Sequence, residues 1–333
     1  MMNWANWTYM GVTMTADDVM EQFIPYAERI VVTGCHGLLG QKLHELLSST
    51  NDIIGIDLSA DSFLTGNSYK YISLDITRRS EVVDAILENQ PGIIINTAAI
   101  TGVDRCEDER ELCWRVNVHA VENLIRAAAK VDAHLIQISS DYVFDGNDPP
   151  YRETDLPRPL GFYGKSKLAA ENAMRGSDIQ ETIVRTQLLY GVAPMIRSNF
   201  VDFIRTKLEC DEDLQIVDDQ IGNPTLADDL ARGIARIIQL RKRGIYHISG
   251  SESISRYDFA REIARTFDED PNRISAMKTN DLDQKALRPQ NSTFCLDKIA
   301  GELRFKPFDV KNGLNEYRKQ LTHLKAAIGG KSL

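Results

Sequence analysis

The stretch that decides the fold reads Arg29-Ile30-Val31-Val32-Thr33-Gly34-Cys35-His36-Gly37-Leu38-Leu39-Gly40. A β-branched run comes first, glycines then recur at every third position, and leucines follow at helical spacing. This order predicts a strand, a tight turn and a helix. Glycine lets a backbone approach a phosphate closely, and a helix N-terminus offers N–H donors and partial positive charge. The turn is therefore a candidate phosphate-binding loop.

A second strand is expected over residues 51–57, and it ends in a carboxylate, Asp57. Asp57 follows the glycine turn by about twenty residues, where an acidic side chain would meet the ribose of a bound dinucleotide. A glycine-rich turn that binds nothing is the alternative. Asp57 would repel a 2′-phosphate, and Leu58-Ser59-Ala60 brings no positive charge to compensate. The predicted cofactor is NADH or NADPH, with NADH favoured.

Composition sets the broad class of the protein. The chain has 333 residues, of which 43% are hydrophobic and 26% are charged, as in globular proteins. Its net charge of −9 argues against a nucleic acid partner. The five cysteines show no C-x-x-C spacing, which predicts reduced thiols, no metal site and a cytoplasmic location. The apolar run at 91–100 is too short for a membrane span.

Strands and helices alternate from Arg29 onward, which predicts an α/β fold with a doubly wound parallel sheet of the Rossmann type. We expect an NAD(P)-binding domain over 29–191 and about 226–249. A smaller, interleaved substrate-binding lobe is expected over 192–225 and 250–333. Residues 1–28 form an N-terminal extension, with a short helix expected within 16–27. The extension is either a poorly ordered tail or an arm on a second subunit of a homodimer.

A group of candidate catalytic residues follows the strand expected at 134–139. Ser140 and Asp141 stand at the end of that strand, where they would face the cofactor. Tyr163 and Lys167 are four residues apart on the next helix, so they share one face. A neighbouring ammonium and the positive nicotinamide ring of the cofactor would lower the tyrosine pKa, Tyr163 would donate a proton to a carbonyl oxygen, and Ser140 would hold that oxygen. A surface pair on an amphipathic helix is the alternative.

Further motifs carry a family resemblance. The chain resembles the extended short-chain dehydrogenases/reductases, and within them the dTDP-4-dehydrorhamnose reductase family, from about Arg29 to about Tyr317. The glycine turn resembles the T-G-x-x-G-x-x-G loop of the extended class. The more specific motifs are Ser140-Asp141-Tyr142-Val143-Phe144-Asp145-Gly146, Tyr163-Gly164-Lys165-Ser166-Lys167, Asp219-Gln220-Ile221-Gly222-Asn223-Pro224-Thr225 and Arg288-Pro289-Gln290-Asn291-Ser292.

The resemblance implies a role for each matching residue. The cofactor would be bound by Gly34, Gly37, Leu38, Leu39, Gly40, Asp57, Asp75, Ile76, Thr97, Ala98, Ala99, Tyr163 and Lys167. The catalytic trio would be Ser140, Tyr163 and Lys167, and the substrate would contact Ser140, Asp141, Leu188, Asn199 and Arg288. The implied reaction is NAD(P)H-dependent reduction of the C4 ketone of a nucleotide-linked 6-deoxy sugar, dTDP-4-dehydrorhamnose to dTDP-rhamnose.

Two alternatives stay open at this point. The segment Arg185-Thr186-Gln187-Leu188-Leu189-Tyr190-Gly191 has leucine where the family often has tryptophan against the sugar, which leaves the sugar unassigned. The chain is also similar to the regulatory β-subunit of methionine adenosyltransferase, which binds a dinucleotide and a partner protein. The Asp219–Thr225 segment favours the reductase. A related nucleotide-sugar epimerase or dehydratase is the other alternative.

Overall fold

The structure is a computed structural model that describes residues 7–9, 12–14, 28–66 and 69–327. The helix expected within 16–27 lies outside these residues. Two short strands near the N-terminus, β1 (Trp7–Tyr9) and β2 (Val12–Met14), pair antiparallel.

The centre of the molecule is a parallel sheet in the order β13-β8-β7-β6-β3-β4-β5. Its strands are β3 (Arg29–Thr33), β4 (Asp52–Asp57), β5 (Tyr69–Ser73), β6 (Ile93–Asn96), β7 (His134–Ser140), β8 (Glu181–Thr186) and β13 (Gly244–His247). The inner strands are continuous apolar runs because both faces of the sheet are covered. The strand order runs outward in both directions from β3, which confirms the predicted doubly wound fold.

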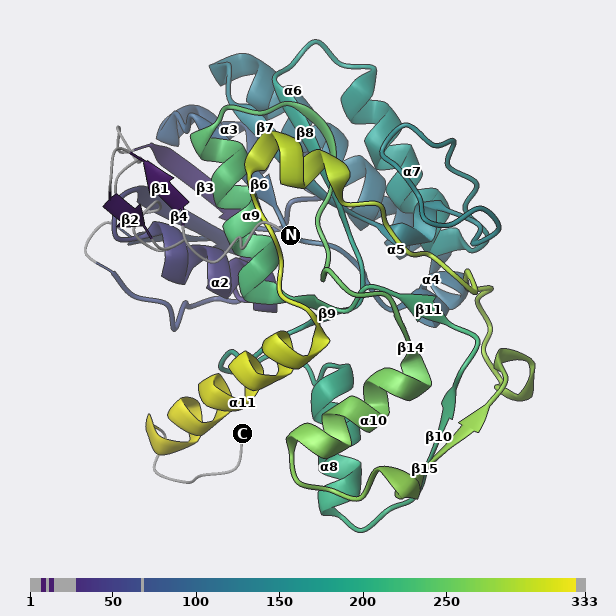
Figure 1. Cartoon of the computed structure of the whole chain (residues 1–333). Helices are drawn as coiled ribbons and strands as arrows, with labels where there is room; N and C mark the ends of the chain where they lie inside the picture. Colours follow the sequence, from purple (N-terminus) through teal and green to yellow (C-terminus); the bar gives the residue numbers. More distant parts are fainter. Residues whose placement is uncertain (1–6, 10–11, 15–27, 67–68, 328–333) are drawn as a thin grey trace.

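Helices cover both faces of this sheet (Figure 1). On one face, α2 (Leu38–Leu47) and α9 (Ala227–Gln239) pack together over a core that includes Leu43 and Ile234. On the other face lie α3 (Arg79–Asn89), α6 (Ala120–Val131) and α7 (Phe162–Arg175), with Val82 and Leu124 in their core. The carboxyl ends of the strands are thus left open between the layers, where ligands of such sheets bind.

The chain from Val103 to Val131 forms four consecutive helical pieces. These are α4 (Val103–Asp108), α5 (Arg110–Trp114), a π-helical turn η1 (Arg115–His119) and α6. Glu109 leaves the helical conformation, with φ −112° and ψ 51°. The Asn117 side chain, in the π-helical turn, bonds both the N–H and the C=O of Ile100. The π-helical turn thus depends on a contact between residues 17 apart in the chain, which local periodicity does not show.

A second lobe lies below the sheet in Figure 1. It contains α8 (Phe200–Glu209), β10 (Leu214–Val217), α10 (Arg256–Thr266), η3 (Pro271–Arg273), β15 (Ile274–Met277), η4 (Thr279–Asp281) and α11 (Val310–Ala327). Its own core includes Ile204, Phe259 and Leu314. Short strand pairs connect it to the sheet domain: β9 (Leu189–Tyr190) with β12 (Thr225–Leu226), and β11 (Ile221–Gly222) with β14 (Ile254–Ser255).

The lobes are more interleaved than the predicted boundary at 250–333 allows. The π-helical turn η5 (Ile299–Leu303) places Ile299 and Leu303 in the core under α9, on the sheet domain. The hydroxyl of Tyr246, on β13, donates to Glu302 at 2.6 Å. Residues 299–303 therefore pack with the sheet. Within the residues that the structure describes, no helix is both long and apolar enough to cross a bilayer.

Candidate active site

The glycine turn after β3 is shaped by close backbone contacts. Gly34 has φ +68°, and a Cβ there would lie 2.8 Å from the backbone nitrogen of Ala98. Its N–H donates to the Ile56 carbonyl at 2.8 Å, which ties the turn to β4. Gly37 precedes α2, and no side chain among the described residues caps that helix. The first N–H groups of α2 are thus available to a phosphate, as the cofactor would need.

Asp57 lies at the end of β4 directly against this turn. Its Oδ2 accepts the backbone N–H of His36 at 3.0 Å, and its Oδ1 accepts the N–H of Leu58 at 2.7 Å. The His36 ring is stacked between Phe63 and Tyr71, at centroid distances of 4.7 and 5.1 Å. The predicted neighbourhood of turn and carboxylate is therefore present in the fold.

Cys35, His36 and Asp57 bring a thiol, an imidazole and a carboxylate within 4.8 Å of one another. Burial raises the pKa of the Cys35 thiol to about 12, so the thiol stays protonated near neutral pH. The His36 Nε2 is 2.9 Å from the Ser62 hydroxyl.

The remaining predicted cofactor residues lie at the ends of neighbouring strands. Thr97 follows β6, and its hydroxyl donates to the carbonyl of Thr33 at 2.7 Å and to that of Gly34 at 3.1 Å. Ala98 and Ala99 continue from there and are half-buried. Asp75 follows β5 and accepts the Thr77 N–H at 2.9 Å. The Ile76 side chain is buried in the core under α3, so an adenine would meet mainly its backbone.

Ser140 and Asp141 end β7 on the same edge of the sheet. The Ser140 hydroxyl donates to Asp141 Oδ1 at 2.9 Å, and the Ser292 hydroxyl donates to Asp141 Oδ2 at 2.6 Å. Asp141 is buried, and burial raises the pKa of its carboxyl above the ordinary value. The two serines thus hold a desolvated carboxylate beside the expected position of the reacting carbonyl.

Tyr163 reaches Ser140 from the first turn of α7. The Ser140 side chain lies close enough to the Tyr163 hydroxyl to act on its pKa, and the Tyr163 ring packs edge-to-face on Tyr142 at 5.6 Å. Gly164 makes this approach possible, because a Cβ there would lie 2.1 Å from the Tyr142 carbonyl oxygen. Any side chain at this position would push α7 away from η2 (Asp141–Val143). Gly164 is a site residue whose role the sequence alone did not reveal.

Burial is the largest influence on the pKa of the Tyr163 hydroxyl. Burial raises the pKa of its hydroxyl above the ordinary value, rather than an ammonium lowering it. Lys167 is buried, and its Nζ donates to the Ile138 carbonyl at 2.6 Å. In this state the tyrosine is a neutral phenol, which is the protonation state that a general acid requires.

Lys167 gives the site an expected pH dependence. Burial lowers the pKa of its ammonium from 10.5 to about 8. A lowered pKa for a base means that the charged form predominates below about pH 8 and is lost above it. We expect kcat/KM for the reduced cofactor to fall as pH rises through this value, because a neutral amine binds ribose hydroxyls less well. Initial rates measured across neutral and alkaline pH test this expectation. If kcat/KM still falls at the same pH in the Lys167→Arg variant, another group causes the pH dependence.

A buried ion pair supports the catalytic helix from behind. Arg185, on β8, donates to both carboxylate oxygens of Glu171, on α7, at 2.9 and 2.7 Å. Both side chains are 1% exposed. The Ser139 hydroxyl donates to Glu171 at 2.5 Å, and Arg185 lies 5.1 Å from the centre of the Phe144 ring. Glu171 is on the same face of α7 as Tyr163 and Lys167, so this pair fixes the helix that carries both.

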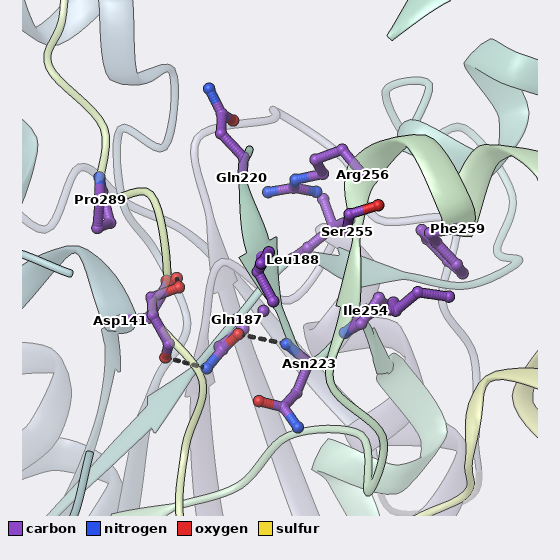
Figure 2. A pocket seen from close by; sticks show the side chains of 14 residues that line it. Asp141, Gln187, Leu188, Gln220, Asn223, Ile254, Ser255, Arg256, Phe259 and Pro289 are labelled. Carbon is purple, nitrogen blue, oxygen red and sulfur yellow. Dashed lines mark hydrogen bonds between the residues drawn. The ribbon is translucent and has the colours of Figure 1, made fainter. Parts of the chain in front are cut away.

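A small pocket opens beside Asp141 (Figure 2). Leu188 is among the residues that line it. Gln187 is fixed there, because its Nε2 donates to the Ser292 carbonyl at 2.7 Å and its Oε1 accepts the Asn223 N–H at 2.6 Å. The other lining residues are Gln220, Ile221, Gly222, Pro224, Ile254, Ser255, Arg256, Phe259 and Pro289.

Asn199 and Arg288 lie near this pocket but are bound elsewhere. Asn199 caps α8 by accepting the N–H groups of Val201 and Asp202, and its amide donates to the Gly191 carbonyl at 2.9 Å. Arg288 forms a two-point ion pair with Asp104, with the shorter bond at 2.6 Å. Neither is among the residues that line the pocket. Their contact with a diphosphate stays a prediction.

Sequence reasoning did not single out Gln187 and Arg256 as site residues. Gln187 precedes Leu188 in the chain. Its side chain joins Ser292 to Asn223 by hydrogen bonds, and these tertiary contacts cannot be predicted from the local sequence. Arg256 belongs to none of the motifs and enters the pocket because β14 pairs with β11. A charged residue at the start of an otherwise ordinary helix carries little local signal.

Comparison with known proteins agrees with this geometry. The sequence model of the family described as RmlD substrate binding domain matches residues 28–323. The dTDP-4-dehydrorhamnose reductase of Aggregatibacter actinomycetemcomitans is 33% identical over 304 residues, covering 87% of this chain and 98% of the relative. Methionine adenosyltransferase 2 subunit beta of Pongo abelii is 31% identical over 278 residues, covering 81% of each chain. The crystal structure of dTDP-4-dehydrorhamnose reductase from Bacillus anthracis in complex with NADP has a TM-score of 0.79 and 33% identity, covering 88% of this chain and 99% of that chain.

A doubly wound parallel sheet with serine, tyrosine and lysine at its carboxyl edge defines the class of extended short-chain dehydrogenases/reductases. The family match spans most of the chain. Within that class, the chain belongs to the dTDP-4-dehydrorhamnose reductase family.

Proposed function

We propose that the protein is an NAD(P)H-dependent reductase acting on the C4 ketone of a nucleotide-linked 6-deoxy sugar, with dTDP-4-dehydrorhamnose as substrate and dTDP-rhamnose as product. The observation that carries this proposal is the gathering of Ser140, Tyr163 and Lys167 at the end of β7, where Ser140 is bonded to Asp141 of the pocket lining. The similarity to dTDP-4-dehydrorhamnose reductases over most of the chain supports the same reaction.

Each residue of the trio has a chemical task in this reaction. The reduced nicotinamide cofactor supplies the hydride when bound. Tyr163 donates its proton to the carbonyl oxygen as negative charge develops there. Ser140 would turn its hydroxyl from Asp141 to hydrogen-bond that oxygen, and Lys167 would hold the ribose hydroxyls of the cofactor. The free N–H groups of α2 would hold the pyrophosphate.

The test is ketone-dependent oxidation of reduced cofactor. The purified chain is mixed with NADPH or NADH and a dTDP-4-dehydro-6-deoxy sugar, and the loss of reduced-nicotinamide absorbance is followed. Mass spectrometry of the product should show the gain of two hydrogens per sugar. A reaction without the ketone is the control. Absence of ketone-dependent oxidation with either cofactor would contradict the proposed reaction.

We further propose that NADH is preferred over NADPH, because the Asp57 carboxylate faces the glycine turn. Replacing Asp57 by alanine should shift the ratio of kcat/KM for the two cofactors toward NADPH by about tenfold or more, because a repulsive charge is removed. Asp61→Ala, which removes an exposed carboxylate from the following loop, is the matched control. Equal kcat/KM for the two cofactors in the unmodified protein would show that Asp57 does not discriminate between a 2′-hydroxyl and a 2′-phosphate.

A regulatory role is the second candidate, supported by the similarity to the methionine adenosyltransferase β-subunit over most of the chain. Such a protein would bind a dinucleotide without reducing a ketone. Tight dinucleotide binding, no turnover and a stable complex with a methionine adenosyltransferase would together decide for it.

A further inference from the structure

Arg256 is a charged residue of the pocket that the proposed chemistry leaves without a task. It is the first residue of α10, whose start is fixed by two bonds. The Ser255 hydroxyl accepts the Asp258 N–H at 2.9 Å, and the Arg256 N–H donates to the Gln220 carbonyl at 2.9 Å. Figure 2 shows the Arg256 side chain among the residues that line the hollow opposite Asp141 and Pro289.

Arg256 lies close to an aromatic ring and to acidic groups, but no ion pair of its guanidinium is found among the described residues. Its guanidinium carbon lies 5.5 Å from the centre of the Phe200 ring. Burial lowers the pKa of the guanidinium, whereas the nearby Tyr142 and Asp141 act in the opposite direction. Arginine stays protonated under such conditions. Both Asp141 oxygens already accept hydrogen bonds from serines, at 2.9 and 2.6 Å.

The other polar side chains of the pocket are bound within the protein. Gln187 is held by Ser292 and Asn223, as described above. The Asn223 Oδ1 accepts the Phe294 N–H at 3.0 Å, and the Gln220 Nε2 donates to the Thr279 hydroxyl at 3.1 Å. Leu188, Ile254 and Phe259 supply apolar surface. Arg256 is therefore the cationic group of this lining, and its planar fork of N–H donors matches a phosphate or carboxylate.

We propose that Arg256 determines substrate specificity by binding the diphosphate of the nucleotide sugar while the sugar ketone lies at Ser140 and Tyr163. This inference rests on the proposed function, since the diphosphate is the charged part of that substrate and its sugar ring is neutral. Ser140 is joined to Asp141 on one side of the pocket, and Arg256 stands on the other. Arg288 is the second guanidinium of the region, but Asp104 occupies its fork.

The test is Arg256→Met, which keeps an unbranched apolar stem and removes the charge. We expect KM for the dTDP-linked ketosugar to rise about 10- to 100-fold, with kcat changed by less than about threefold, because a charged hydrogen bond made equally in ground and transition states is lost. Calorimetry with thymidine diphosphate should show a similar loss of affinity, while thymidine binds both proteins alike. Arg256→Lys should fall between them because it keeps the charge without the fork.

Arg261→Met is the matched control, because Arg261 lies on the same helix but donates to the Tyr257 hydroxyl at 3.1 Å, outside the pocket lining. It should leave KM unchanged. Melting temperatures establish folding, and Arg256→Lys carries the test if the methionine variant does not fold. Turnover with an unchanged KM in Arg256→Met would overturn the inference and leave the proposed function intact. No turnover by the unmodified protein, but thymidine diphosphate binding that Arg256→Met weakens, would reject the proposed function and support the inference.

Discussion

Phenylalanine in place of Tyr163 is expected to lower kcat by about 10²- to 10⁴-fold, because the substitution removes the proton donor and keeps the ring. The ring packs on Tyr142 and the buried thiols of Cys106 and Cys113, so the fold should persist. The dissociation constant of the reduced cofactor should change little. Ketone reduction under saturating cofactor and fluorescence titration of the cofactor measure the two quantities.

Lys167→Ala is the companion to this variant. It removes a group expected to touch the cofactor, so both turnover and cofactor affinity should fall. A Tyr163→Phe protein with near-normal turnover would remove Tyr163 from the mechanism, whatever its affinity for cofactor.

Methionine in place of Arg185 is expected to reduce the free energy of unfolding by about 3–5 kcal/mol, because it leaves the Glu171 carboxylate buried without its cation. The neighbouring His247 cannot replace that cation, since burial lowers the pKa of its imidazole well below 6.5. Urea denaturation of the whole chain, with the melting temperature as a second readout, measures the loss.

The double variant Glu171→Leu/Arg185→Met should recover much of this loss, because neither charge then remains buried. Arg318→Met is the surface control. It breaks an ion pair with Asp268 in which the side chains are 49% and 74% exposed. Such a pair contributes about 0–1 kcal/mol. Equal destabilisation by Arg185→Met and Arg318→Met would show that the buried pair has no special role in stability.

Much of the fold could be predicted because its signals are local. The apolar run of β3, the glycines after it and the Asp57 carboxylate lie within one short segment, and the structure joins them by short hydrogen bonds. Tyr163 and Lys167 share a helix face by spacing alone. Features that depend on long-range contacts could not be read in this way. The π-helical turn is held by the hydrogen bonds between Asn117 and Ile100. Ile299 packs under α9 although the two are far apart in the sequence.

The charge states of the site residues were harder to predict than which residues form the site. Tyr163 and Lys167 both have pKa values set by burial, which a sequence does not display. Arg256 and Ser140 are far apart in the chain, and only the pairing of β11 with β14 brings the start of α10 to the pocket. The residue types at the motif positions indicated the chemistry. The protonation states of these residues and the composition of the pocket wall are determined by tertiary packing.

The crossing of the chain between its two lobes limits how such a protein can change during evolution. After Tyr190 the chain enters the second lobe, and it returns to supply α9 and β13 before leaving again. Since α9 covers the apolar face of α2, including Leu39 and Leu43, a chain cut after β9 would leave that face bare. The second lobe therefore cannot be exchanged as a block between relatives. We expect new substrate preferences to arise by single substitutions in place, at wall positions such as Leu188.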